Sequence, residues 1–171
     1  MAGSLRTGIW LVGAIEVPLP EYMTPGAAGM DLCAAIEEPR TIDPGTRTLV
    51  PTGLGIAVPV GFEAQVRPRS GLAVRAGLTV INTPGTIDSD YRGELRVALV
   101  HLGSEPVIIE PLERIAQLVV SPVVQVVWEL LATGDDGLPM SESTQRGSGG
   151  FGHTGRKPDR KPDRKSDRKP E

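Results

Sequence analysis

The stretch "NTPGTIDSDYRGEL", residues 82–95, concentrates side chains that exchange protons or bind charge between two apolar runs. A turn between two strands needs only Gly, Pro, Asn or Asp at its corner, and Asn82, Pro84 and Gly85 already supply these. Four more polar side chains follow that corner: Asp88, Asp90, Tyr91 and Arg92. Two carboxylates, a phenol and a guanidinium in so short a loop indicate a role beyond joining two strands.

A second stretch, "RPRSGLAVRAG" at residues 67–77, offers groups that bind anions. Arg69, Ser70 and Gly71 bring a guanidinium, a hydroxyl and accessible backbone N–H groups to the start of a possible short helix. Taken alone the signal is weak, because many loops contain Arg-Ser-Gly. No GxxxxGK[ST] pattern occurs in the sequence, which excludes a P-loop nucleotide site.

Two single polar residues interrupt otherwise apolar runs. Asp31 lies in "AAGMDLCA", residues 27–34, where a lone Asp often only hydrogen-bonds a turn. Gln117 lies in "RIAQLVV", residues 114–120, where a glutamine often marks an edge or solvent-facing position of a strand. Each residue by itself therefore favours a structural role.

The stretch "RGSGGFGHTG", residues 146–155, holds five glycines in ten residues and cannot form a stable strand or helix. Its plain interpretation is a flexible linker. Its functional interpretation is a mobile lid, in which the glycine backbone wraps phosphates, Arg146 meets a charged oxygen and Phe151 stacks on a flat ring.

The elements that must position these groups are predicted to be strands. The apolar runs are short, and turn residues separate them at intervals of roughly 8–12 residues, which is typical of a β-sandwich or a closed β fold. Aromatic residues make up only 4% of the chain, so the core must consist of Val, Ile, Leu and Ala. No segment has helical periodicity over a helix's length, although "SGLAVRAG" could form one or two turns.

The chain has one cysteine, Cys33, so no intrachain disulfide is possible, and a reducing cytoplasm is the expected location. The apolar run "IWLVGAI" near the N-terminus is only seven residues long before Glu16 and predicts an ordinary first strand. No apolar run approaches the length of a membrane span, and no membrane partner is expected.

The last sixteen residues, 156–171, repeat a "DRKP" unit and contain no apolar side chain other than proline. They hold 8 basic and 4 acidic residues, a net charge of +4, whereas residues 1–155 hold 10 basic and 17 acidic residues, a net charge of −7. Such a segment cannot pack and is predicted to be disordered. It could tether the chain to nucleic acid or membrane, but the alternating charges favour a solubilising end, so no specific nucleic-acid binding is expected.

Taken together and in order, five motifs make the sequence resemble the trimeric dUTP diphosphatase (dUTPase) family: "AGMDLCA", "PRSGLA", "NTPGTIDSDYRGEL", "RIAQLVV" and "RGSGGFGHTG". The resemblance extends from about residue 15 to residue 155. It implies an all-β fold, a distorted jelly-roll β-barrel of residues 1–140 that forms a homotrimer with sites shared between subunits. Residues 141–155 would be the lid over the active site, and residues 156–171 fall outside the resemblance as a disordered basic tail.

The resemblance also implies the activity: hydrolysis of dUTP to dUMP and pyrophosphate by attack of water on the α-phosphorus. This reaction limits uracil in DNA and supplies dUMP for dTMP synthesis. Asp88 would be the general base that takes the proton of the attacking water. Mg²⁺ would neutralise the phosphate chain, held mainly by phosphate oxygens and water, with Asp31 acting through water or supporting the site from behind.

The substrate-binding residues that the resemblance implies are Arg69, Ser70, Gly71, Asn82, Gly85, Thr86, Ile87, Asp88, Tyr91, Arg96, Gln117, Arg146 and Phe151. The first three and Gln117 would bind phosphates. Asn82 and the backbone of residues 86–88 would meet the uracil edge, and Tyr91 would lie under the deoxyribose and exclude UTP. Arg146 would reach the γ-phosphate, and Phe151 would cover the uracil.

Two other functions share these features. A dCTP deaminase-like enzyme would have the same fold, but "GTIDSDYRGEL" carries Asp rather than Glu at the key position and favours the hydrolase. A regulatory protein that binds the nucleotide without hydrolysing it is the alternative of a different class. Asp90 could pair with Arg92 or Arg96, and His153 is not needed as a base when Asp88 is present.

Overall fold

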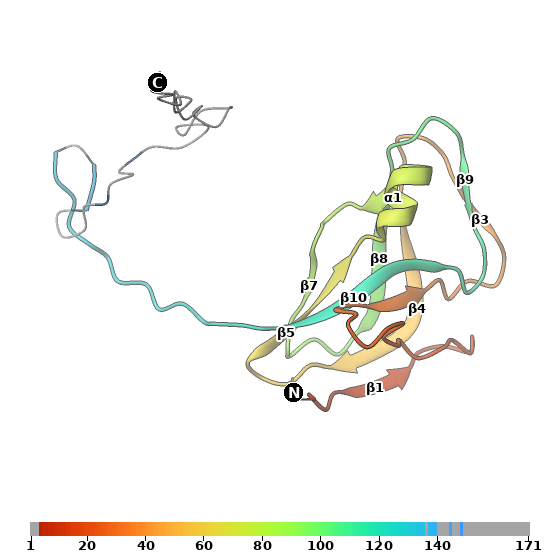
Figure 1. Cartoon of the computed structure of the whole chain (residues 1–171), viewed down its shortest axis with the longest axis horizontal. Coiled ribbons are helices and arrows are strands. Elements are labelled where there is room, and N and C mark those ends of the chain that lie inside the picture. The colour runs from red at the N-terminus through yellow and green to blue at the C-terminus, as the bar shows by residue number, and fades with distance from the viewer. Residues whose placement is uncertain (1–3, 136, 140–143, 145–147, 149–171) are drawn as a thin grey trace, which may run out of the picture. The chain divides into compact units, whose positions relative to one another are not determined.

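The computed structural model describes residues 4–135, 137–139, 144 and 148. The chain divides into two units, residues 1–125 and residues 126–171, and every named strand and the helix lie in the first (Figure 1). Their bounds are β1 (Gly8–Leu11), β2 (Met30–Cys33), β3 (Arg40–Ile42), β4 (Arg47–Ala57), β5 (Phe62–Arg67), α1 (Ser70–Ala76), β6 (Leu78–Val80), β7 (Gly85–Ile87), β8 (Glu94–His101), β9 (Val107–Ile109) and β10 (Arg114–Pro122). The prediction of an all-β fold is confirmed.

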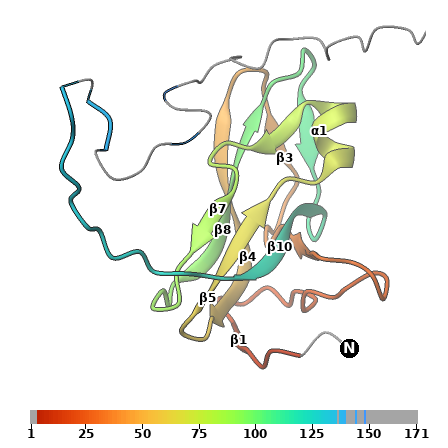
Figure 2. The same ribbon diagram turned by 60° about the vertical axis from the view of Figure 1, so that its left-hand side comes forward.

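The strands of the first unit form antiparallel sheets. One sheet has the order β1-β4-β8-β6, a second has the order β2-β10-β5-β7, and β3 pairs with β9. The expected first strand is β1, which pairs with β4. Figures 1 and 2 show β4 and β8 side by side, with α1 close to the end of β8. Among the described residues, no helix is long and apolar enough to span a bilayer.

One hydrophobic core lies between the two four-stranded sheets. Strand β8 alternates strictly, with Leu95, Val97 and Leu99 buried and Arg96 exposed, because successive side chains of a strand point to opposite faces. The second sheet contributes residues such as Leu32 to the same cluster. The buried apolar residues are Val, Leu, Ile and Ala, as the scarcity of aromatic residues predicts.

The polar stretch of residues 82–95 is not a single tight turn between two strands, as its sequence suggests, because it contacts both sheets. Strand β6 before it and β8 after it pair in the first sheet, but β7 within it pairs with β5 at the edge of the second sheet. Gly85 is opposite Val66 and is buried, and Thr86 is opposite Gln65 and is exposed. The stretch is therefore a crossing between sheets, since β5 offers backbone partners that residues 85–87 would lack in an isolated turn.

The short helix α1 confirms the prediction of one or two turns in "SGLAVRAG". It ends at Gly77, which has a φ of 66° and donates its backbone N–H to the carbonyl of Leu72. A Cβ at this position would lie 2.5 Å from the backbone nitrogen of Gly103. Only glycine meets both conditions, so the helix stops there and β6 begins at the next residue.

Candidate active site

Asp31 on β2 is the centre of an ion-pair cluster. Its Oδ1 lies 2.9 Å from Nε of Arg69, and its Oδ2 lies 3.0 Å from Nη1 of Arg114. The Asp31 side chain is only 18% exposed. Instead of capping a turn, this carboxylate joins β2 to the start of β10 and to the residue that precedes α1.

Two further hydrogen bonds fix the segment before α1 against β10. Arg69 donates from Nη1 to the carbonyl of Arg114 at 3.0 Å, and Gln117 donates from Nε2 to the carbonyl of Pro68 at 2.9 Å. Gln117 lies in the middle of an interior strand, opposite Asp31 on β2 and Arg67 on β5. Gln117 is therefore not at an edge of the sheet, because β10 has a neighbour on each side, and its side chain is half-buried.

A glycine makes room for Gln117. A Cβ on Gly29 would lie 2.5 Å from Oε1 of the Gln117 side chain. Gly29, two residues before Asp31, therefore leaves space that the amide of Gln117 occupies.

These contacts bring the predicted anion-binding groups to one cavity of about 180 Å³. Its lining residues are Asp31, Arg69, Ser70, Gly71, Arg75 and Gln117. Five of the six were predicted from three separate motifs. Asp31 is the only carboxylate among these lining residues, and two guanidinium groups already contact it. The cavity therefore carries the positive charge that binding of an anion requires.

Arg75 is the lining residue that the sequence interpretation missed. It lies four residues after Gly71 on α1, and a Cβ on Gly71 would be 2.9 Å from its Nη2. Long helical side chains point back toward the N-terminus, so residues at i and i+4 meet on one face. The signal was present in "SGLAVRAG" as this spacing of glycine and arginine.

The polar stretch holds itself together mainly through backbone carbonyls. Tyr91 donates its hydroxyl to the carbonyl of Glu94 at 2.9 Å, and Arg92 donates from Nη1 to the carbonyls of Ser89 and Tyr91, both at 2.7 Å. Asp88 accepts the backbone N–H of Tyr91 with its carbonyl oxygen at 3.2 Å, and the residue is exposed.

The expected partners of Asp90 are occupied elsewhere. Arg92 binds carbonyl groups, and Arg96 pairs through Nε with Oε2 of Glu94 at 3.0 Å. Within the described part of the chain, therefore, neither guanidinium contacts Asp90. The amide of Asn82 lies against Gly85, where a Cβ would be 3.0 Å from its Nδ2.

The structure does not bring all predicted residues together. None of the described residues between 82 and 96 lines the cavity around Asp31. A larger hollow of about 610 Å³, lined by residues 35–41 with Ile15 and Pro51, contains no predicted site residue. Arg146 and Phe151 lie outside the described residues.

Cys33 borders the Asp31 cluster but does not offer a thiolate. Burial, and then the charge of Asp31, raise the pKa of its thiol, whereas Arg114 and Arg69 act in the opposite direction. The net effect is a pKa above the ordinary value, which keeps the sulfur protonated at neutral pH. Nucleophilic catalysis by Cys33 is therefore not supported.

Comparison with known proteins gives consistent matches. The dUTPase family model matches residues 15–155. A Chlamydia pneumoniae protein named deoxyuridine 5'-triphosphate nucleotidohydrolase is 59% identical over 137 residues, covering 80% of this chain and 90% of the relative. A Desulfotalea psychrophila protein of the same name is 52% identical over 149 residues, covering 86% and 95%.

Solved structures agree in fold. A mutant of the Staphylococcus bacteriophage 80alpha dUTPase with dUpNHpp matches with a TM-score of 0.73 at 20% identity, covering 89% of this chain and 99% of the phage chain. A mutant dUTPase from phage phi11 of S. aureus, described with a structural Mg(II) ion, matches with a TM-score of 0.68 at 18% identity, covering 75% and 98%.

Proposed function

Because the chain belongs to the dUTPase family, we propose that it is a hydrolase that converts dUTP to dUMP and pyrophosphate. The observation that carries this proposal is the cavity in which Arg69, Ser70 and Gln117 converge from two different segments. A guanidinium, a hydroxyl and an amide at one small polar site match the oxygen-rich chain of a nucleoside triphosphate. The reaction limits uracil in DNA and supplies dUMP for dTMP synthesis.

In the proposed mechanism, water attacks the α-phosphorus and Asp88 takes its proton. The new P–O bond forms as the bond to the bridging oxygen breaks, and pyrophosphate leaves. Arg69, Gly71 and Gln117 bind phosphate oxygens, and Ser70 lies near the bridging oxygen that departs. Because Arg69 is held at two atoms before substrate arrives, little reorganisation is needed when charge develops.

Mg²⁺ is the ion that we propose for the phosphate chain. Among the described residues no group of three or more His, Cys, Asp or Glu side chains could hold a metal, and both oxygens of Asp31 already meet guanidinium groups. Mg²⁺ commonly keeps several waters and takes other ligands from phosphate, so one nearby carboxylate is sufficient. The residues therefore fit an ion that arrives with the substrate, with Asp31 acting through water or by holding Arg69. When bound, the ion would neutralise charge that repels the attacking water.

The stretch of residues 82–96 is proposed to select the nucleoside. Asn82, Gly85 and the backbone of residues 86–88 would pair with the uracil edge. Cytosine presents the opposite donor and acceptor pattern there, and unpaired buried polar groups can discriminate by about 10⁴-fold. The methyl group of thymine would overpack the pocket, which typically costs roughly 1–3 kcal/mol. Tyr91 would lie under the deoxyribose and leave no space for a 2′-hydroxyl, and Arg96 would contact the substrate.

A homotrimer of jelly-roll barrels with shared sites is proposed as the working form. In one chain the described residues of the polar stretch do not line the anion cavity, which supports a site completed by a second copy. Apolar side chains after β10 are highly exposed, including Val124 at 87% and Val127 at 94%. Apolar surface of this kind commonly marks a subunit contact.

We propose the domain boundaries expected from the sequence: a barrel over residues 1–140, a lid over residues 141–155 and a basic tail over residues 156–171. Arg146 and Phe151 of the lid would contact the γ-phosphate and the uracil. With one cysteine and no disulfide possible, the cytoplasm is the proposed location.

The test is pyrophosphate release from dUTP, measured beside dTTP, dCTP and UTP, with and without Mg²⁺. We expect turnover of dUTP alone, strongly dependent on Mg²⁺. Ammonia release from dCTP would identify the deaminase alternative. Tight binding of dUTP without any product would instead support a regulatory protein.

A further inference from the structure

Strand β4 contains an irregularity opposite the start of β8. Val50 pairs with Val97 and Pro51 with Arg96, but the next pair is Gly55 with Glu94. Three residues of β4, Thr52 to Leu54, thus face Leu95 alone. Such a bulge removes backbone groups from the ladder, and these groups need other partners.

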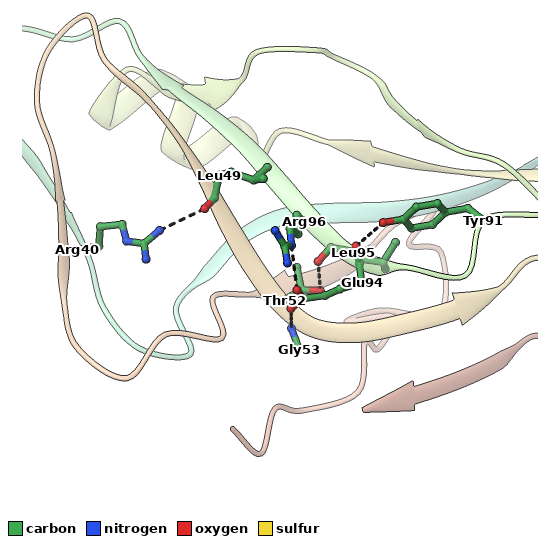
Figure 3. Close-up of polar contacts among 8 residues, drawn as sticks. All are labelled: Arg40, Leu49, Thr52, Gly53, Tyr91, Glu94, Leu95 and Arg96. Atoms are coloured by element: carbon green, nitrogen blue, oxygen red, sulfur yellow. Dashed lines mark hydrogen bonds and ion pairs between the residues drawn. The ribbon is translucent and has the colours of Figure 1, made fainter. Parts of the chain in front are cut away.

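Two side chains supply the missing partners (Figure 3). Glu94 accepts the backbone N–H of Gly53 with Oε1 at 3.0 Å, and Thr52, which is fully buried, donates its hydroxyl to the carbonyl of Leu95 at 2.7 Å. Gly53 has a φ of 67°, and a Cβ there would lie 3.2 Å from that of Ala35. The bulge is thus a constrained feature, and Glu94 is the carboxylate that satisfies it.

The same glutamate reaches two residues of the proposed nucleoside site. Its second oxygen, Oε2, lies 3.0 Å from Nε of Arg96, which is two residues along β8 and on the same face of the strand. Its backbone carbonyl accepts the hydroxyl of Tyr91. Figure 3 shows Glu94 between Gly53 on one side and Tyr91 and Arg96 on the other.

The different burial of the two side chains indicates that Glu94 positions Arg96, and not the reverse. The Glu94 side chain is 13% exposed, whereas that of Arg96 is 56% exposed. A carboxylate that is already fixed by a backbone N–H can restrict a solvent-exposed guanidinium, but a mobile guanidinium cannot fix the carboxylate. Restricting the side chain in advance lowers the entropy lost when it binds substrate.

We propose that Glu94 is a positioning residue for the nucleoside site, transmitting the fixed geometry of the β4 bulge to Arg96 and Tyr91. The inference rests on the proposed function, because Arg96 and Tyr91 contact substrate only if that function holds. Glu94 itself has no place in the reaction chemistry. Its carboxylate orients Arg96, and its fixed backbone holds the Tyr91 hydroxyl.

Two substitutions separate these effects. In Glu94→Gln the amide oxygen can still accept the N–H of Gly53, but an N–H group now faces Arg96. In Glu94→Ala both contacts are lost. The matched control is Glu113→Ala, because Oε2 of Glu113 also accepts a backbone N–H, that of Glu110, at 3.0 Å, in a turn away from the nucleoside stretch.

Glu94→Gln should raise KM for dUTP about threefold, as expected for a partly exposed ion pair, with kcat and the preference for dUTP over UTP unchanged. Glu94→Ala should in addition lower that preference about fivefold, because the carbonyl that binds Tyr91 is no longer fixed. Glu113→Ala should change neither value. If Glu94→Ala fails to fold, Glu94→Gln alone still tests the contact with Arg96.

A double-mutant cycle with Arg96→Gln decides whether Glu94 acts through Arg96. If it does, the rise in KM caused by Arg96→Gln becomes about threefold smaller in the Glu94→Gln background. Additive effects on KM would overturn this contact as a positioning device. Unchanged discrimination against UTP in a folded Glu94→Ala protein would overturn the role toward Tyr91.

Failure of the proposed function has a different signature. A wild-type protein that does not hydrolyse dUTP refutes the activity, and amide hydrogen exchange of the free protein then tests the positioning itself. Exchange at Gly53 and at residues 89–93 should accelerate together in Glu94→Ala and not in Glu113→Ala. Faster exchange at Gly53 alone would show that Glu94 stabilises the bulge without holding the nucleoside stretch.

Discussion

The anion cavity and the stretch of residues 82–96, called here the nucleoside stretch because it is proposed to select the nucleoside, are held in place by different interactions. The cavity depends on ion pairs and amide contacts that join β2, β10 and the residues before α1, so three elements of one chain complete it. The nucleoside stretch depends on hydrogen bonds to its own carbonyls and on the bulge in β4. The proposed phosphate site is thus built from contacts within one chain, whereas the stretch proposed to select the base and sugar is largely exposed.

The largest effect is expected for Asp88 in the nucleoside stretch, where a substitution should lower turnover without changing substrate binding. Asp88→Asn should lower turnover by at least about 10²-fold, the low end for loss of a general base, and should leave the fold and dUTP affinity intact. Single-turnover kinetics and calorimetric titration measure the two quantities. Near-normal turnover would mean that another residue activates water.

Mixing two inactive proteins tests whether the cavity and the stretch of one site come from different subunits. Asp88→Asn damages the stretch, and Arg69→Gln damages the cavity. In a cyclic trimer with shared sites, each mixed trimer contains one intact site, and random mixing makes about three quarters of trimers mixed, so activity should recover to about a quarter of wild type. Background activity, with exchange confirmed by native mass measurement, would place both parts in one subunit.

Breaking the ion-pair cluster should affect the cavity alone. Asp31→Asn keeps the shape of the side chain but removes the charge that holds Arg69 and Arg114. The value of kcat/KM should fall about tenfold, since hydrogen bonds to charged groups contribute about 1.5–3 kcal/mol. Discrimination against UTP should not change. The control is Asp43→Asn on an exposed turn, and an equal loss there would contradict a local effect.

Arg75→Gln should have a smaller effect of the same kind. Arg75 lines the cavity on an exposed side, so we expect KM for dUTP to rise about threefold without change in kcat. The control is Arg47→Gln, an exposed arginine that does not line the cavity. A rise in KM that persists at high salt would contradict a screened, exposed contact.

Ending the chain at Gly155 should have no effect on turnover or on the number of subunits in the oligomer. Residues 156–171 contain no apolar side chain other than proline and cannot contribute to a core. Steady-state kinetics at physiological salt and native mass measurement provide the comparison. A several-fold loss of turnover would show that the basic repeat helps to capture an anionic substrate.

Local patterns in the sequence indicated anion-binding groups at residues 69–71, whereas the expectation that Asp31 and Gln117 join them came from the family resemblance. Arg69, Ser70 and Gly71 are consecutive, so their shared place at the start of α1 follows from the chain itself. Asp31 and Gln117 were singled out because polar groups interrupted apolar runs, and a buried polar group needs a partner. Their facing positions on β2 and β10, and the contact between Arg75 and Gly71, required the register and the helix geometry.

The sequence by itself determined the all-β class, the aliphatic core and the residue types at the site, because strand periodicity, turn residues and side-chain chemistry act over a few residues. Tertiary structure decided that β7 joins the second sheet, that Asp31 pairs with two arginines, and that Glu94 satisfies a bulge 41 residues earlier in the chain. These contacts join residues that are distant in sequence. Their pairing depends on the order and register of the strands, which are set when the two sheets pack around one core.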